Sequence, residues 1–316
     1  MNTAAVGALL TSITSQNILG ENVLWHDAEQ AIYWIDIEGA LLQRYSLADA
    51  EYSVFTLPQR IGSFAFLQPA PQHDFQLIAA FAEGFALYNP QTKALKWLSQ
   101  PEAHVAGHRF NDGRVNRQGE FWAGTMVEQA TADTAASGSL YRLDQHGCQQ
   151  MLSGLRIPNA LCWNRDSSLM YHADSPTQQI NRYRFNPVSG DIGNAERFAA
   201  TPEGTEPDGA IIDADDHLLC ALWGGSALAR YAADGSLAAL YPLPVTQPTC
   251  VALGGDKLDI LFVTTATEGL SAEQLSQQPQ AGNLLVYHYP HQGLTEPQLA
   301  VMPWQQLAQR YHGGAE

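Results

Sequence analysis

The sequence predicts an all-β protein, a six-bladed β-propeller, because one strand pattern repeats along it and two sets of marker residues each count six repeats. The pattern is an apolar strand, a polar turn with Asp or Gly, a second apolar strand, a loop and a strand that carries a tyrosine. It is seen in VLWHDAEQAIYWIDIEGALLQRY, LCWNRDSSLMYHADSPTQQINRY and AIIDADDHLLCALWGGSALARY.

The first set of markers is the residue before each polar turn, and its members stand roughly 40 to 50 residues apart: Trp25, Phe66, Val115, Trp163, Ile212 and Leu253. The second set is the tyrosine that closes each repeat: Tyr45, Tyr88, Tyr141, Tyr183, Tyr231 and Tyr287. Three or four short strands in a repeat of this length are typical of a propeller blade, which buries its faces against two neighbours. Helical repeats would instead show apolar residues at i, i+3, i+4 and i+7.

The chain offers no Pro/Ser-rich linker, so a single six-bladed domain over residues 1–316 is predicted. A short helical insertion is expected only at SAEQLSQQ, residues 271–278. Four tryptophans at strand positions are expected in the core rather than at a ligand: Trp25, Trp34, Trp122 and Trp163.

The composition excludes several classes of protein. The 316 residues carry 32 Asp and Glu against 16 Lys and Arg, a formal charge of −16 that repels nucleic acid and anionic membranes. The four cysteines lack CxxC spacing, so reduced core thiols are expected rather than a zinc-thiolate site. The N-terminal stretch lacks a basic region and a long apolar run, which predicts a cytoplasmic protein without a signal peptide or a membrane span.

Three oxygen-bearing residues precede the first strands of different repeats by the same few residues. They are Glu21 in LGENVLW, Asn159 in IPNALCW and Asp208 in EPDGAIID. Equal positions in three blades would place them around one axis, a geometry suited to a divalent cation with open positions for water and substrate. The alternative is that Pro-Asn-Ala and Pro-Asp-Gly are type I turns whose side chains bond their own backbone.

Polar residues also crowd the third repeat, in GHRFNDGRVNRQGEFWAGTM. Arg109 and Asn111 stand where its first strand begins, and their donors and acceptor suit the hydroxyls and carbonyl of a small polar ligand. The pair Asp112-Gly113 is predicted to form a turn, and Arg114 and Arg117 to be solvated or ion-paired.

Other catalytic signatures are absent from the sequence. It has no GxSxG elbow, no GxxxxGK[ST] phosphate loop, no dinucleotide-binding glycine pattern and no HExxH pair. Its ten histidines are scattered, and His26, His104, His108 and His172 are expected to be loop or packing residues, with a place near the predicted site as the alternative for His108, beside Arg109.

The segments RFNDGRVNRQGEFWAGTM, GLRIPNALCWNRDSSLMYHADS and EPDGAIIDADDHL resemble the gluconolactonase and regucalcin-like family, also called senescence marker proteins. The resemblance runs from Gly20 to about Tyr287. It implies a six-bladed propeller and hydrolysis of a sugar lactone with one divalent cation, which could be zinc, calcium, manganese or magnesium.

Matched residue by residue, the resemblance implies that the metal ligands are Glu21, Asn159 and Asp208, with Asp208 also the general base. Arg109 and Asn111 match substrate-binding residues of the family, and a further acidic contact falls on VEQ, where Glu128 and Gln129 compete.

Three departures concern substrate choice more than chemistry. Relatives commonly have Gly-Glu-x-Pro where this chain has GENVLW, Pro-Asn-Gly where it has PNALCW, and Asp at the place of Asn116. The expected function is therefore metal-dependent hydrolysis of an aldonolactone. A phosphotriesterase-like hydrolase and a non-catalytic propeller that binds a metal or a partner are the alternatives.

Overall fold

A computed structural model describes residues 3–69, 74–128, 137–299 and 301–311. The chain packs as two compact units. The first comprises Met1–Val54 with Asn159–Glu296, and the second comprises Phe55–Pro158 with Pro297–Glu316. The boundaries fall within β5 and at the first residue of β14.

The first unit holds four of the six four-stranded sheets, each a blade. One consists of β2 (Gly20–His26), β3 (Ala31–Asp36), β4 (Leu41–Ser46) and β5 (Tyr52–Thr56). Another consists of β14 (Pro158–Trp163), β15 (Leu169–Asp174), β16 (Gln179–Arg184) and β17 (Glu196–Ala200). A third consists of β18 (Glu206–Ile212), β19 (Leu218–Trp223), β20 (Ala227–Tyr231) and β21 (Leu237–Pro242). The last joins β22 (Pro248–Gly254), β23 (Ile260–Thr265) and β24 (Leu284–His288) to β1 (Leu9–Ile13).

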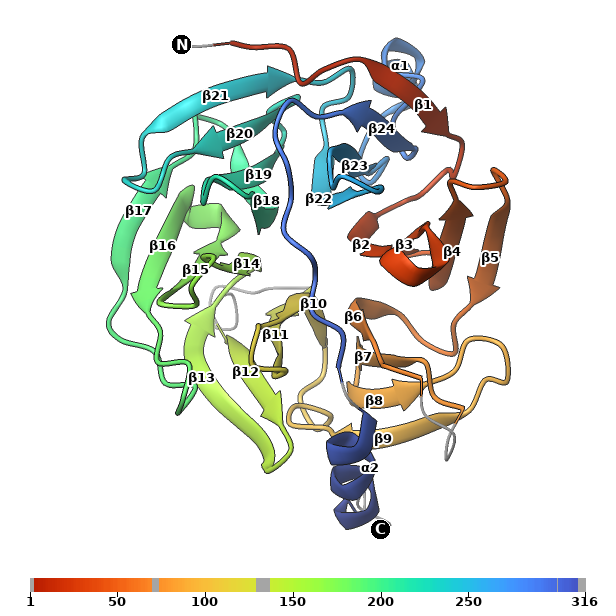
Figure 1. Ribbon diagram of the computed structural model, residues 1–316, viewed down its shortest axis with the longest axis vertical. Coiled ribbons are helices and arrows are strands. Elements are labelled where there is room, and N and C mark those ends of the chain that lie inside the picture. The colour runs from red at the N-terminus through yellow and green to blue at the C-terminus, as the bar shows by residue number, and fades with distance from the viewer. Residues whose placement is uncertain (1–2, 70–73, 129–136, 300, 312–316) are drawn as a thin grey trace. The chain divides into compact units, whose positions relative to one another are not determined.

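The second unit holds two sheets and a helix. One sheet consists of β6 (Ile61–Phe66), β7 (Leu77–Phe81), β8 (Gly84–Tyr88) and β9 (Leu95–Ser99). The other consists of β10 (His108–Val115), β11 (Phe121–Val127), β12 (Gly138–Asp144) and β13 (Gly147–Leu155). Helix α2 (Val301–Arg310) follows (Figure 1).

The predicted fold class, an all-β six-bladed β-propeller, is confirmed. All six residues of the first marker set lie at or near the ends of the first strands, β2, β6, β10, β14, β18 and β22. All six tyrosines lie on the third strands, β4, β8, β12, β16, β20 and β24. The extent of the domain, residues 1–316, stays a prediction.

The tyrosines do not close the blades, because a fourth strand follows each of them. In the last blade this strand is β1 from the N-terminal end of the chain, which pairs antiparallel with β24 (Figure 1). Five of the six outer strands, all but β9, carry exposed residues, and β5 alternates between exposed and partly buried residues, whereas β7 and β8 are buried throughout. The apolar signal therefore fades at the outer strand, which carries no marker residue.

The core lies between neighbouring blades of the same unit. In the first unit Trp25 of β2 stacks on Phe262 of β23, with ring centroids 5.7 Å apart. In the second unit Phe85 of β8 meets Phe110 of β10 at 4.6 Å. The four tryptophans predicted in the core are at most 5% exposed, so that prediction is confirmed: Trp25, Trp34, Trp122 and Trp163.

Helix α1 (Ala272–Gln277) confirms the predicted insertion, and Ser271 and Gln274 form a capping box at its start. Helix α2 had not been predicted, although Trp304, Leu307, Ala308 and Tyr311 follow the helical spacing. Trp304 and Leu307 pack into the core of the second unit. Within the described residues no helix is long and apolar enough for a bilayer crossing, and all four cysteines are free thiols.

Candidate active site

The three predicted metal ligands occupy the same place in three blades of the first unit. Glu21, Asn159 and Asp208 each stand on the first strand, four residues before the marker residues Trp25, Trp163 and Ile212. Each is buried, with exposures of 9%, 5% and 5%. The equivalent positions in the other three blades carry Gly62, Asn111 and Thr249. In the three blades that carry the predicted ligands, the repeat therefore places one oxygen-bearing side chain at the same position of each first strand.

The backbone is irregular at this level. The register of β2 on β3 shifts between Glu21 and Leu24, and that of β18 on β19 shifts between Pro207 and Ala210. Bulges of this kind redirect a side chain and are common beside active sites. Asn22 and Ala160, which follow two of the predicted ligands, have φ of 42° and 54°, a conformation that costs a non-glycine residue free energy.

Both sequence neighbours of Glu21, Gly20 and Asn22, constrain its position. Its Oε2 accepts the backbone N–H of Asn22 at 3.0 Å. The preceding Gly20 admits no side chain, because a Cβ there would lie 2.5 Å from Asn17 Nδ2 and 2.7 Å from Thr265 O. Packing thus requires the glycine of GENVLW, and the hydrogen bond from Asn22 orients the glutamate beside it.

The orientation of the Asn159 amide follows from a chain of hydrogen bonds. Ser175 donates its hydroxyl proton to Pro207 O at 2.7 Å. Because a serine hydroxyl has one proton, it accepts the 2.9 Å hydrogen bond from Asn159 Nδ2. This bond turns Nδ2 towards Ser175, and Oδ1 is the atom of the amide with the chemistry to bind a cation.

Two turn readings of the sequence are wrong. Asn159 and Asp208 lie inside strands β14 and β18, and the side chain of Asn159 donates a hydrogen bond to Ser175, in the connection between β15 and β16 of the same blade. Asp112 and Gly113 lie inside β10, where the register on β11 shifts between Phe110 and Gly113. A β-bulge uses the residues of a turn, which explains the errors at Asp208 and at Asp112-Gly113. Arg114, expected to be solvated or ion-paired, is only 6% exposed.

The predicted substrate-binding residues of the second unit form one hydrogen-bonded group. Arg109 Nη1 donates to Asn111 Oδ1 at 2.8 Å and to Phe110 O at 3.0 Å. Asn111 Nδ2 donates to Pro158 O at 3.1 Å. Both side chains are buried, with exposures of 6% and 8%, so their positions are set by the protein before any ligand arrives.

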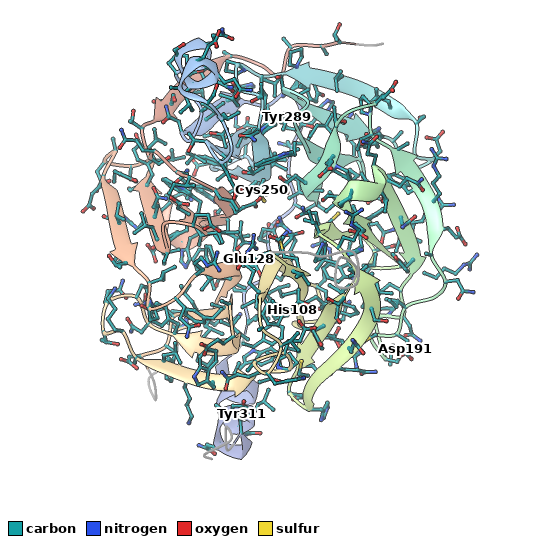
Figure 2. All side chains as sticks on the ribbon, turned by 180° about the vertical axis from the view of Figure 1, so that it is seen from behind. His108, Glu128, Asp191, Cys250, Tyr289 and Tyr311 are labelled. Carbon is teal, nitrogen blue, oxygen red and sulfur yellow. The ribbon has the colours of Figure 1, made fainter. Side chains whose placement is uncertain are left out.

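Glu128 belongs to the same group through a residue that the sequence had not indicated. Arg60 binds its carboxylate with two hydrogen bonds of 2.6 and 2.7 Å, and Arg109 Nε reaches Oε1 at 3.0 Å. Figure 2 labels Glu128. Partial burial alone would raise the pKa of the Glu128 carboxyl, but the two arginines outweigh it and hold that pKa below its usual value. Gln129, the competing candidate, lies outside the described residues.

His108 belongs to a second polar cluster of the same blade (Figure 2). Its Nδ1 lies 2.7 Å from Glu102 Oε2, and its Nε2 lies 3.1 Å from Ser137 Oγ. Glu102 also accepts hydrogen bonds from Thr125 and Tyr141. These contacts place His108 in this cluster, whereas Arg109, its neighbour in sequence, binds Glu128 and Asn111.

The predicted ligand set suits a hard divalent cation. Two carboxylates and one amide oxygen are the donors that calcium, magnesium and manganese take in proteins, and the amide oxygen is directed by Ser175. Among the described residues no group of three or more His, Cys, Asp or Glu side chains could hold a metal. A mixed set of two carboxylates and an amide is a different arrangement, so the fit rests on the chemistry of its oxygens.

Residues 19–267 match the model of the SMP-30/gluconolactonase/LRE-like region. The chain belongs to this family. The L-arabinolactonase of Azospirillum brasilense is 32% identical to it over 92% of this chain and 94% of the relative. The 6-deoxy-6-sulfogluconolactonase of Pseudomonas putida is 31% identical over 91% and 97%. A crystal structure of regucalcin from Agrobacterium tumefaciens, described as a calcium-binding protein, superposes with a TM-score of 0.85 at 28% identity, over 93% of this chain and 99% of that one.

The match to the SMP-30/gluconolactonase/LRE-like family covers Glu21, Asn159 and Asp208 together with Arg109, Asn111 and Glu128. The sequence resemblance rested on segments from the same region. Arg60 also lies within it, although no motif had singled it out, because an arginine among LPQRIGSF shows no charge partner until the chain is folded.

Proposed function

We propose that this protein hydrolyses a sugar lactone to its aldonic acid, with one divalent cation held by Glu21, Asn159 and Asp208. Family membership and relatives named as sugar lactonases support the reaction class. The observation that carries the proposal is the equal placement of three buried oxygen-bearing side chains on the first strands of three blades.

The reaction that these residues would perform is acyl transfer from the ring oxygen to water. When bound, the cation would supply a Lewis acid that polarises the lactone carbonyl. Asp208 would accept a proton from the attacking water at a carboxylate oxygen, as the carbonyl carbon gains its bond to the water oxygen. The bond to the ring oxygen then breaks, that oxygen takes up the proton, and the open-chain acid leaves. Because a bound cation lowers the basicity of a carboxylate, Asp208 would act as the proton acceptor only while its bond to the cation is weak.

The group of the second unit is proposed to bind the hydroxyls of the sugar. The guanidinium of Arg109 and the amide of Asn111 are fixed by protein contacts, which reduces the entropy lost when a ligand binds. Glu128 is proposed as an acceptor for a hydroxyl. Its carboxylate stays ionised well into acidic solution because of the two arginines.

A second candidate function is cation binding without catalysis. It is favoured by the similar solved structure, which is described as a calcium-binding protein. In that case the buried ligand set would be retained and the group around Glu128 would hold no substrate. Measurable lactone turnover that depends on the cation decides between the two functions.

The experiment is an assay of the full chain on glucono-, galactono-, arabinono- and xylono-lactones, with a phosphotriester in parallel. The protein is first stripped with a chelator and then supplied in turn with zinc, calcium, manganese or magnesium. The proposal predicts turnover of at least one lactone, its loss on chelation and its return with a cation. Turnover that persists after thorough chelation contradicts the metal role, and preference for the phosphotriester contradicts the substrate class.

A further inference from the structure

The backbone carbonyl just before each predicted metal ligand accepts a hydrogen bond from a side chain of the preceding blade. In the first unit Thr249 of β22 donates to Gly20 O, before Glu21 of β2. In the same unit Ser175, in the short turn of helix that follows β15, donates to Pro207 O, before Asp208 of β18. Neither hydroxyl is part of the predicted ligand set.

The same contact recurs in the second unit, where Asn111 donates to Pro158 O, the carbonyl before Asn159. Asn111 and Thr249 occupy the repeat position that carries the ligands in other blades, four residues before Val115 and Leu253. At Gly62, which occupies this position in the blade before β10, a Cβ would lie 2.5 Å from Phe110 O. At these three positions a carbonyl of the next blade therefore lies close by: Asn111 and Thr249 donate to it, and Gly62 leaves room for it.

Thr249 is suited to hold a peptide rather than to bind a ligand itself. It is fully buried, and since a carbonyl has no proton, its hydroxyl is the donor to Gly20 O. Its Oγ1 lies 2.9 Å from Thr264 Oγ1, which keeps the side chain in one rotamer. The bond fixes the peptide plane between Gly20 and Glu21, from which the Glu21 side chain departs.

Ser175 acts at two ligands at once. It is 3% exposed, it fixes the amide of Asn159 by accepting from Nδ2, and it holds the Pro207 carbonyl next to Asp208. An alanine there would remove both contacts. The Asn159 amide would then lose the partner that distinguishes its oxygen from its nitrogen, and a flipped amide presents N–H groups, which repel a cation.

We propose that Ser175 and Thr249 are positioning residues of the cation site, which orient Glu21, Asn159 and Asp208 without contacting the ion. This inference rests on the proposed function above. Residues that orient metal ligands affect metal affinity by about 10- to 100-fold when replaced. We expect a loss of that size for each hydroxyl.

The test is the dissociation constant of Ca²⁺ and of Mn²⁺ for the full chain, measured by titration calorimetry on metal-free protein. The informative pair is Thr249→Val, which keeps the shape and removes the hydroxyl, and Thr249→Ser, which keeps the hydroxyl and removes a methyl group. Ser175→Ala tests the second position independently. Thr265→Val is the matched control, because Thr265 donates to Asn283 O at 2.7 Å in the same unit and precedes no predicted ligand.

Thr249→Val and Ser175→Ala are expected to raise the dissociation constant about 10- to 100-fold, whereas Thr249→Ser and Thr265→Val keep the wild-type value. Urea unfolding of the metal-free proteins shows whether a variant is folded. Wild-type affinity in both hydroxyl-deleted variants, or equal losses in Thr249→Val and Thr249→Ser, overturns the inference and leaves the proposed function standing. A wild-type protein that binds neither ion overturns the proposed cation site and this inference with it.

Discussion

The two units carry their predicted functional residues in different ways. In the first unit Glu21, Asn159 and Asp208 come from three separate blades, one per first strand. In the second unit Arg60 and Arg109 both bind the carboxylate of Glu128. The first arrangement presents oxygen atoms. The second is a cluster in which the charges of the two arginines and the carboxylate are already paired.

This difference separates two kinds of task. Donor atoms delivered singly by rigid strands suit a metal ion, which needs several oxygens in fixed places. A saturated group of arginines and a carboxylate suits hydroxyl recognition, because each member can exchange part of a charged contact for a contact with the ligand. Changes in the first unit should therefore affect turnover and metal affinity, and changes in the second should affect KM.

The largest effect is expected at Asp208. Asp208→Asn keeps the shape but removes the proton acceptor, so kcat should fall by about 10² to 10⁴, the usual contribution of a general base. Steady-state kinetics on the preferred lactone measures it. Asp234→Asn is the control, because Asp234 caps an exposed turn through Ser236 and should leave kcat unchanged. Near-normal turnover of Asp208→Asn would remove the functional distinction between the two units.

A smaller effect, mainly on KM, is expected at Arg109. Arg109→Lys keeps the charge and loses the fork that reaches Glu128, Asn111 and Phe110 O at once. Hydrogen bonds to charged groups contribute about 1.5–3 kcal/mol, so KM should rise about 10- to 100-fold with kcat less affected. A variant that loses kcat while keeping its KM would place Arg109 in the chemistry instead.

The ion pairs of Glu128 in the second unit should make the stability of the protein depend on pH. The folded-state pKa of Glu128 lies below the unfolded value, so its contribution to the free energy of unfolding is present above the unfolded pKa and is lost as pH falls through the lowered folded pKa. Glu128→Gln lacks this contribution. Its urea midpoint should be lower than that of the wild type at neutral pH, and the difference should shrink as the solution becomes acidic below about pH 4. Parallel curves from neutral to acidic pH would show that the ion pairs of Glu128 add no stability.

The smallest effects separate Arg60 from an ordinary surface arginine. Arg60→Gln releases one partner of Glu128, whereas Arg182→Gln breaks the exposed Arg182–Glu196 pair in the first unit. Exposed pairs contribute about 0–1 kcal/mol to stability, so neither change should unfold the protein. We expect a several-fold rise of KM for Arg60→Gln and wild-type kinetics for Arg182→Gln. Identical kinetics for the two variants would remove Arg60 from substrate binding.

Much of the fold could be predicted because each repeat carries the same apolar pattern within a short stretch of sequence. Each first strand is buried on both faces, so its apolar run and the residue before its turn are dictated by neighbouring blades, as Trp25 and Phe262 illustrate. The sequence did not mark the outer strands, because most of them face solvent on one side and so carry a weaker apolar pattern. The pairing of β1 with β24, which completes the last blade, was not predicted, because pairing between the two ends of a chain leaves no local signal in the sequence.

The candidate site, too, could be predicted only where the sequence itself carries a pattern. The side chains at the repeat position could be found by their spacing, and the family resemblance gave them roles. Arg60, Ser175 and Thr249 could not be found, since their partners lie far away in sequence: Glu128, Pro207 O and Gly20 O. The bulges at Asp112-Gly113 and Pro207-Asp208 were mistaken for turns because a bulge uses the same small and polar residues.

The central claim is that Glu21, Asn159 and Asp208 bind one cation, and anomalous X-ray scattering from crystals grown with Mn²⁺ tests it most directly. The account predicts a single strong peak with an oxygen of each of the three side chains about 2.0–2.6 Å away. A peak bound elsewhere, or one that only a single member of the set approaches within that distance, would contradict it.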